Sequence, residues 1–136
     1  MPSPDDIVRH ARPGGTVVGW SLDRGQRAEL LARFEPRYGN VVADHVTLAA
    51  KVARDASLPD EVRAEAVGHI YDDQGVEALV VAIEGTTDRP DGSTYHITWS
   101  LGPGRRARES NDVLARAPWQ PLREPIPLVL TPARWP

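Results

Sequence analysis

Two short motifs in this chain carry side chains suited to acid–base chemistry. The first is His45-Val46-Thr47-Leu48 and the second is His96-Ile97-Thr98-Trp99, so each places a histidine two residues before a threonine. Because successive side chains of a β-strand point to opposite faces, each histidine would share a face with its threonine, while the apolar residues turn to the other face. The sequence therefore predicts two strands that present four polar groups, His45, Thr47, His96 and Thr98, to one cleft.

The chemistry that suits these groups is the cleavage of a phosphodiester. An imidazole with an ordinary pKa of about 6.5 can act as a base or as an acid near neutral pH, so two imidazoles can supply both roles. One would take a proton from the attacking water, and the other would give a proton to the leaving ribose oxygen. The hydroxyls of Thr47 and Thr98 could donate hydrogen bonds to the phosphate oxygens in the transition state. We expect no metal cofactor, and the sequence leaves open which histidine is the acid and which is the base.

The elements that would position the first motif follow from capping and turn signals. Residues 16–22 are rich in β-branched and aromatic side chains, which predicts a strand. Asp23, with Gln26 three residues later, predicts the start of a helix that Pro36 ends. The first motif then lies in a strand predicted over 41–52.

The second motif is expected in a meander of three strands. An acidic turn over 72–75 that ends in glycine separates the first two of them. The turn Pro90-Asp91-Gly92 precedes the third. The three strands are predicted over 62–71, 76–84 and 95–101.

The two ends of the chain contain many prolines. Near the N-terminus at most a short helical piece over 7–12 is expected. Ser110-Asn111 predicts the start of a short helix that Pro118 ends. Beyond it one strand is predicted, over 126–131, and we expect it at a sheet edge because proline cannot donate to a central ladder.

Length and composition predict one domain. The chain has 136 residues, of which 40% are hydrophobic, and this suits a single compact α+β domain over 16–131 with a loose segment at 1–15 and a tail at 132–136. The absence of cysteine excludes a disulfide framework and suits a reducing compartment. The start of the chain lacks the pattern of a signal peptide, and no apolar run is long enough to cross a bilayer. We therefore expect a cytoplasmic protein that does not engage a membrane.

Charge narrows the range of partners. The formal net charge of −3 at pH 7 argues against non-specific binding of long duplex nucleic acid. Binding of a small or terminal phosphate is still compatible with this charge. Arg105, Arg106 and Arg108 follow the second motif and could hold a second phosphate or the RNA backbone, although solvated loop charge is the alternative interpretation. Of these, Arg105 and Arg106 are the predicted substrate-binding residues, together with Tyr38, which could stack on a base.

The paired His-Val-Thr-Leu and His-Ile-Thr-Trp sequences resemble the duplicated His-x-Thr/Ser motifs of the two-histidine (2H) phosphoesterase superfamily. Within it, the chain looks most like the cyclic phosphodiesterase domains that accompany RNA ligases, and Ser110-Asn111 is similar to a Ser-Asn pair of that branch. The resemblance implies a bilobal α+β fold, in which two mostly antiparallel sheet halves flank a central cleft and two main helices lie outside.

The same resemblance implies an activity. It is the metal-independent hydrolysis of 2′,3′-cyclic phosphate ends of RNA, or of a small cyclic nucleotide-like phosphodiester. The catalytic set carried over by the motifs is His45, Thr47, His96 and Thr98. The implied partners are an RNA terminus or a small nucleotide-like phosphodiester, and an RNA ligase or kinase encoded separately.

Two departures from the family pattern keep other interpretations open. Asp44 precedes the first histidine, where the family usually has an apolar residue, and the spacing between the motifs is short. The alternative function is a non-catalytic module that binds RNA or a phosphorylated ligand in the same cleft, and a third is a structural domain in which the repeat is accidental. A zinc site of His45, His69 and His96 is a further alternative, although nothing in the spacing of His69 mirrors the other two.

Overall fold

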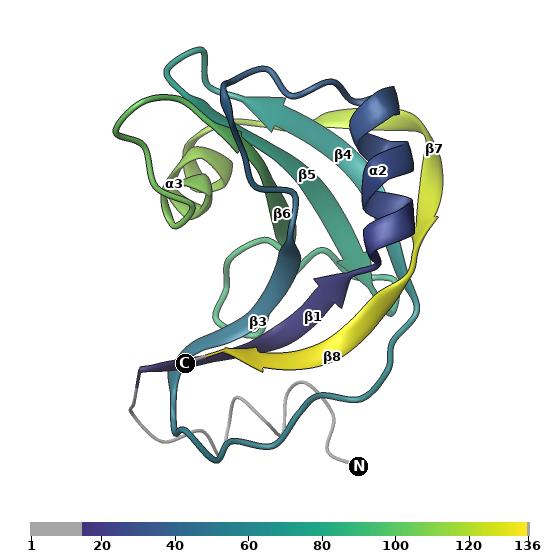
Figure 1. Ribbon diagram of the computed structural model, residues 1–136, viewed down its shortest axis with the longest axis vertical. Helices are drawn as coiled ribbons and strands as arrows, with labels where there is room; N and C mark the ends of the chain where they lie inside the picture. Colours follow the sequence, from purple (N-terminus) through teal and green to yellow (C-terminus); the bar gives the residue numbers. More distant parts are fainter. Residues whose placement is uncertain (1–14, 136) are drawn as a thin grey trace.

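The computed structural model describes residues 15–135, and within them the chain forms an α+β fold of two helices and eight strands (Figure 1). The strands form a three-stranded sheet of order β3-β1-β8 and a five-stranded sheet of order β2-β6-β5-β4-β7. Every strand pair in the described part of the chain is antiparallel. The helical piece expected over 7–12 lies outside the described residues. The elements are β1 (Thr16–Leu22), α2 (Arg24–Arg33), β2 (Asn40–Val41), β3 (His45–Val52), β4 (Ala64–Tyr71), β5 (Val76–Ile83), β6 (His96–Leu101), α3 (Glu109–Arg116), β7 (Gln120–Leu128) and β8 (Leu130–Trp135).

The first strand and helix form where the local signals predict them. The carboxylate of Asp23 accepts a hydrogen bond of 2.9 Å from the backbone N–H of Gln26, which satisfies one of the free donors at the start of α2. The helix ends at Arg33, shortly before Pro36. The predictions of this strand and this helix are confirmed. A cap and a helix terminator act over only a few residues, so the local sequence is enough to predict them.

The strand predicted over 41–52 is wrong in one respect, because it is broken into two. β2 ends at Val41 and β3 begins at His45, and the two strands belong to different sheets. Between them, the backbone N–H groups of Val42 and Ala43 still donate to carbonyls of β6 at 2.9 Å. The chain thus leaves the five-stranded sheet beside one motif strand and enters the three-stranded sheet as the other motif strand.

The predicted meander is confirmed by the neighbouring order of β4, β5 and β6. β5 is buried along its whole length, because its two faces pack against different apolar clusters. One face meets the core shared with the three-stranded sheet, and the other meets α3. The residues of β5 that face the shared core are Leu79, Val81 and Ile83, and those that face α3 are Val76, Ala78 and Val80.

The C-terminal part contains more strand than predicted. Instead of one strand over 126–131 there are two, β7 and β8, and each lies at the edge of its sheet, as expected for proline-containing strands. β8 pairs with β1 as far as Trp135, so residues 132–135, which we expected in a tail, are part of the sheet.

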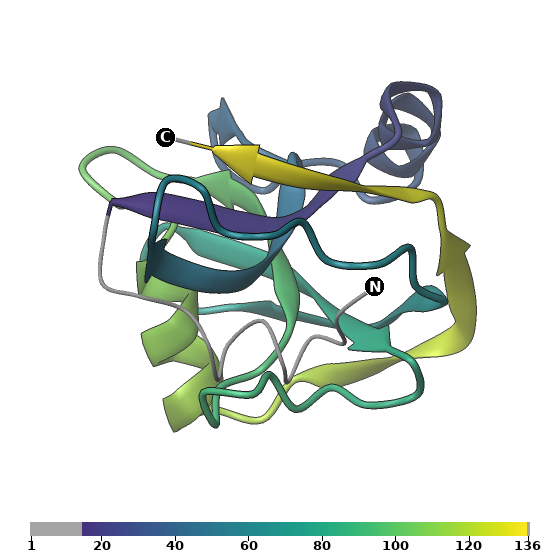
Figure 2. The same cartoon turned by 90° about the horizontal axis from the view of Figure 1, so that it is seen from below.

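The apolar residues of both motifs form part of the shared core. Val46, Leu48, Ile97 and Trp99 are at most 1% exposed and pack in one cluster with residues of β1, β4 and β5. The helices α2 and α3 lie on opposite sides of the molecule in both views (Figures 1 and 2). Neither α2 nor α3, the two helices of the described residues, is long and apolar enough to span a bilayer.

Candidate functional site

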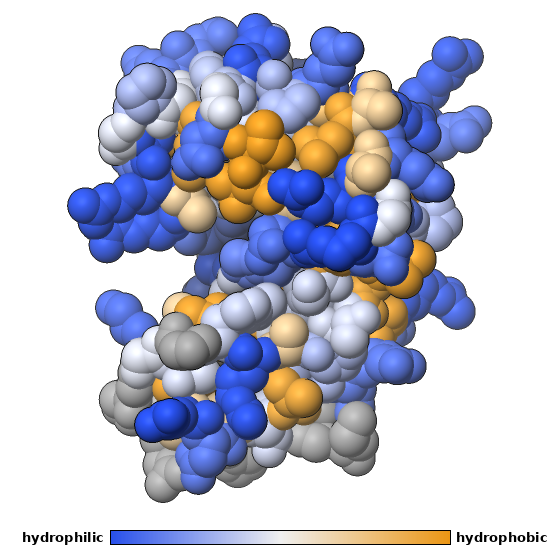
Figure 3. Space-filling view, in the orientation of Figure 1, coloured by the Kyte–Doolittle hydropathy of each residue, from blue (hydrophilic) through white to orange (hydrophobic). Residues whose placement is uncertain are grey.

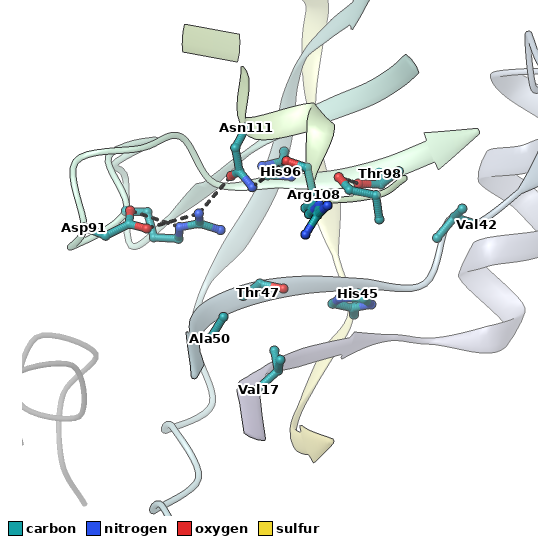
Figure 4. A pocket seen from close by; sticks show the side chains of 12 residues that line it. Val17, Val42, His45, Thr47, Ala50, Asp91, His96, Thr98, Arg108 and Asn111 are labelled. Carbon is teal, nitrogen blue, oxygen red and sulfur yellow. Dashed lines mark hydrogen bonds and ion pairs between the residues drawn. The ribbon is translucent and has the colours of Figure 1, made fainter. Parts of the chain in front are cut away.

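A cavity of about 220 Å³ brings the two motifs together. His45 and Thr47 line it from β3, and His96 and Thr98 line it from β6, so that the two pairs face each other across the gap (Figure 4). Figure 3 shows the surface hollowed on the same side of the molecule, between the part that carries α3 and the part that carries β3. The other lining residues are Val17, Val42, Ala50, Arg89, Asp91, Ala107, Arg108 and Asn111.

Strand alternation explains why these four side chains meet. On each motif strand the apolar residues turn into the shared core, which leaves histidine and threonine on the opposite face. Because β3 and β6 lie in different sheets and contact each other, their polar faces converge on one cavity. The four residues predicted as the catalytic set thus lie together.

His96 is buried, and its hydrogen bond fixes which nitrogen is available. Nδ1 lies 2.8 Å from the carbonyl oxygen of Thr94, and because a carbonyl only accepts, Nδ1 carries the hydrogen. Burial lowers the pKa of His96 to about 4, and the positive charges of Arg89 and His45 act in the same direction. At neutral pH the ring is therefore uncharged, and Nε2 offers a lone pair to the cavity.

His45 is half-buried and is held from outside the cavity. Its Nδ1 lies 3.0 Å from Oδ2 of Asp44, and its ring packs against that of Trp135 with centroids 4.6 Å apart. A carboxylate also only accepts, so here too Nδ1 donates and Nε2 is the nitrogen left for the cavity. Both imidazoles thus present the same atom to the space between them.

The two threonine hydroxyls differ in their surroundings. Within the described residues, the hydroxyl of Thr47 makes no hydrogen bond and is free to donate into the cavity. Thr98 Oγ1 lies 2.9 Å from Oγ of the fully buried Ser110 and 3.3 Å from the carbonyl oxygen of Ala107. The predicted second helix is present as α3, but Ser110 is not its cap, because α3 starts at Glu109 and the serine hydroxyl bonds to Thr98 instead.

A buried arginine that is not among the predicted site residues also lines the cavity. Arg89 is only 8% exposed, and its guanidinium donates to both carboxylate oxygens of Asp91 at 3.1 and 3.2 Å and to Oδ1 of Asn111 at 2.8 Å. Although burial raises the pKa of Asp91, hydrogen bonds from Arg89 and Ser93 lower it to about 2. This ion pair is therefore present at all ordinary pH values. The signal in the sequence was its place in the loop just before the second motif strand, which could form a rim of the cleft.

Among the residues that the structure describes, Arg108 is the cavity arginine whose guanidinium has no partner. Its side chain extends from the start of α3 into the space between the two motif strands (Figure 4). Within residues 15–135 its guanidinium forms no ion pair and no hydrogen bond. An arginine fork in this position can take two oxygens of one phosphate group.

The three residues predicted from the sequence to bind substrate do not line the cavity. Arg105 forms ion pairs with Asp72 at 3.1 Å and with Glu109 at 3.2 Å. Arg106 is exposed, and its backbone N–H donates to Glu109. The hydroxyl of Tyr38 is buried and has no hydrogen-bond partner among the described residues. Of the three arginines in this loop, it is therefore Arg108 that lines the cavity.

The zinc alternative is wrong for His69. Nε2 of His69 lies 2.8 Å from Oε2 of the buried Glu77, and His69 does not line the cavity with the other two histidines. Within the described part of the chain, no group of three or more His, Cys, Asp or Glu side chains is arranged to hold a metal ion.

Comparison of the chain with models of protein families, with curated proteins and with solved structures finds no match. What the cavity can do chemically follows from its own side chains. It combines two imidazoles that both present Nε2, a free hydroxyl and a free guanidinium. Such groups can bind an anion and move protons to and from it.

Proposed function

We propose that this protein is a metal-independent phosphodiesterase of the 2H type, with the corresponding bilobal fold, that hydrolyses 2′,3′-cyclic phosphate ends of RNA or a small cyclic nucleotide-like phosphodiester. The observation that carries the proposal is that both His-x-Thr motifs line one cavity of about 220 Å³, with each Nδ1 bonded to an acceptor that is not part of the lining. Each of the two sheets contributes one motif strand, which supports the bilobal arrangement.

In the proposed reaction the two histidines have different roles. Neutral His96 takes a proton from water through Nε2 as the water oxygen forms a bond to phosphorus. The bond from phosphorus to one ribose oxygen breaks, and protonated His45 gives the proton on its Nε2 to that oxygen. The product is a phosphomonoester with one free ribose hydroxyl. Proton exchange with solvent then returns both rings to their starting states.

The remaining cavity groups would stabilise the phosphate. Hydroxyls of Thr47 and Thr98 and the guanidinium of Arg108 are the donors available for the non-bridging oxygens. Since the charge of Arg89 is matched by Asp91, Arg108 supplies the unmatched positive charge. One such charge complements the single negative charge of a phosphodiester.

The test uses an oligonucleotide that ends in a 2′,3′-cyclic phosphate, incubated with the protein in EDTA. We expect turnover by the unaltered protein and a loss of about 100-fold or more in His45→Ala and in His96→Ala, since each removes a general acid or base. His69→Ala is the matched control, because this histidine lies outside the cavity. A cyclic phosphate that stays intact with the unaltered protein would rule out the proposed activity.

The second candidate is a module that binds RNA or a phosphorylated ligand in this cavity without turnover. The low pKa of His96 favours it, because a base with a pKa of about 4 accepts protons poorly at neutral pH. Binding of the same oligonucleotide without cleavage, weakened in Arg108→Ala, is the result expected for this candidate.

A further inference from the structure

A carboxylate next to the first motif joins His45 to the start of α2. Asp44 uses Oδ2 to accept from His45 Nδ1 at 3.0 Å and Oδ1 to accept from Arg24 Nη1 at 3.1 Å. Arg24 is itself anchored, because Nη2 donates to the carbonyl oxygen of Asp44 at 3.0 Å and Nε donates to that of Leu22 at 3.1 Å. The backbone N–H of Leu22 also donates to the Asp44 carbonyl, at 2.9 Å. The carboxylate of Asp44 thus accepts from both His45 and Arg24, while its backbone carbonyl accepts from Arg24 and Leu22.

The other surroundings of His45 contain no second acceptor for its Nδ1 among the described residues. Trp135 of β8 packs against the ring at an interplanar angle of 45°, and its indole N–H can only donate. The charged and titratable groups at the cavity and at the outer edge of the ring are Arg24, Asp44, Arg89, Asp91, His96 and Arg108. Of the two carboxylates in this set, Asp91 is bonded to Arg89, so Asp44 is the negative charge in contact with His45.

The two cavity histidines therefore differ in the charge of the group bonded to Nδ1. For His96 that group is a neutral carbonyl, and for His45 it is a carboxylate. A carboxylate stabilises a protonated imidazole through an ion pair, whereas a carbonyl supplies only a hydrogen bond. On the protonated ring the second hydrogen sits on Nε2, the atom that faces the cavity.

We propose that Asp44, held by Arg24, is a positioning residue that fixes the tautomer of His45 and makes this ring the proton donor of the cavity. The proton-donor part rests on the proposed function, and the tautomer part does not. After the proton passes from Nε2 to the leaving oxygen, the neutral ring keeps its Nδ1 hydrogen on Asp44. The residue that departs from the 2H pattern would then separate the roles of two otherwise similar histidines.

The direct test is ¹⁵N NMR of the His45 ring at a pH where it is neutral. We expect Nδ1 to carry the hydrogen in the unaltered protein and in Asp44→Asn, because an asparagine oxygen can still accept. In Asp44→Ala we expect the hydrogen to move largely to Nε2. Asp73→Ala is the matched control, since it removes another carboxylate paired with an arginine, at 3.5 Å, away from the cavity. Retention of the Nδ1 hydrogen in Asp44→Ala would overturn the positioning role.

Kinetics test the proton-donor role separately. Asp44→Asn keeps the tautomer and removes the charge, so we expect kcat to fall by about 10-fold or more with KM little changed. An unchanged kcat in Asp44→Asn would overturn the assignment of the acid. If the unaltered protein shows no turnover, the proposed function fails while the NMR result still decides the tautomer.

Discussion

The hydroxyl of Thr98 lies 2.9 Å from the hydroxyl of Ser110, a fully buried side chain in the first turn of α3. This contact ties the second motif strand to the helix that carries Arg108 at its start. A cavity group and its supporting helix are thus joined by one hydrogen bond.

Replacing Thr98 separates the two uses of its hydroxyl. We expect Thr98→Val to lower the free energy of unfolding by about 1–3 kcal/mol, because it leaves the buried Ser110 hydroxyl with one partner fewer. Thr98→Ser keeps the hydroxyl and should retain most of the stability and turnover. Urea unfolding and hydrolysis of the cyclic phosphate measure the two effects. Equal loss of turnover in both variants would contradict a role for the hydroxyl.

Two arginines of one loop provide a matched comparison. Arg108 lines the cavity with a free guanidinium, whereas Arg106, which the sequence suggested as a substrate ligand, does not line it. Loss of a charge-assisted hydrogen bond of about 1.5–3 kcal/mol should weaken substrate binding by roughly 10- to 100-fold in Arg108→Ala. Arg106→Ala should bind within about twofold of the unaltered protein, as for a solvated surface charge. Titration of the labelled oligonucleotide measures both, and an equal loss in Arg106→Ala would support the sequence-based prediction.

The buried His96 should make stability depend on pH. Burial lowers its pKa to about 4 from the ordinary 6.5, so between these values the unfolded chain binds a proton here and the folded protein does not. The resulting loss of stability is absent above pH 6.5, grows as the pH falls and amounts to on the order of 3 kcal/mol near pH 4. Unfolding in urea at a series of pH values measures it.

His96→Gln is the variant that isolates this effect, because it removes the titrating ring. Its stability should fall less steeply between pH 6.5 and 4 than that of the unaltered protein. Carboxylates with lowered pKa values, such as Asp91, lose their stabilising effect only at lower pH and do so in both proteins. Parallel curves for the two proteins would be inconsistent with the lowered pKa.

The close approach of β1 to β3 should make Gly19 sensitive to substitution. Gly19 pairs with Thr47, and a Cβ at this position would overlap the carbonyl oxygen of Val46 and lie 3.0 Å from the backbone nitrogen of Leu48. Gly19→Ala would push the motif strand aside, so we expect a loss of about 1–3 kcal/mol in stability together with lower turnover. Thermal unfolding and the hydrolysis assay check both.

Gly39→Ala is the control for this substitution. A Cβ at Gly39 meets no atom within 4 Å, and Gly39 is not among the glycines with positive φ. Its stability and turnover should match those of the unaltered protein. A Gly19→Ala protein that is as stable as this control would show that the strands can separate without cost.

Much of the fold could be predicted from local signals. The cap at Asp23, the terminator Pro36 and the alternation of His45, Val46 and Thr47 each act over a few residues, so the sequence alone predicts them. The break between β2 and β3 could not be predicted in this way. It places Ala43 at a φ of 43°, a conformation that no property of alanine favours.

The cavity lining beyond the motifs depends on contacts between distant segments. Arg89 is buried, and its guanidinium donates to Asn111 on the helix after the second motif strand. Arg105 and Arg108 look alike in the sequence, and the ion pairs of Arg105 with Asp72 and Glu109 decide which of them is free. Such differences arise from tertiary structure, so turn and charge patterns do not reveal them.

The two imidazoles are anchored in separate sheets, and the apolar interior between those sheets helps to set the gap between the rings. Neither sheet carries all four polar groups of the two motifs, because each contributes one imidazole and one threonine hydroxyl. Replacing a large core side chain such as Trp99 with a smaller one would therefore change the space available to an anion without altering any side chain that contacts the anion.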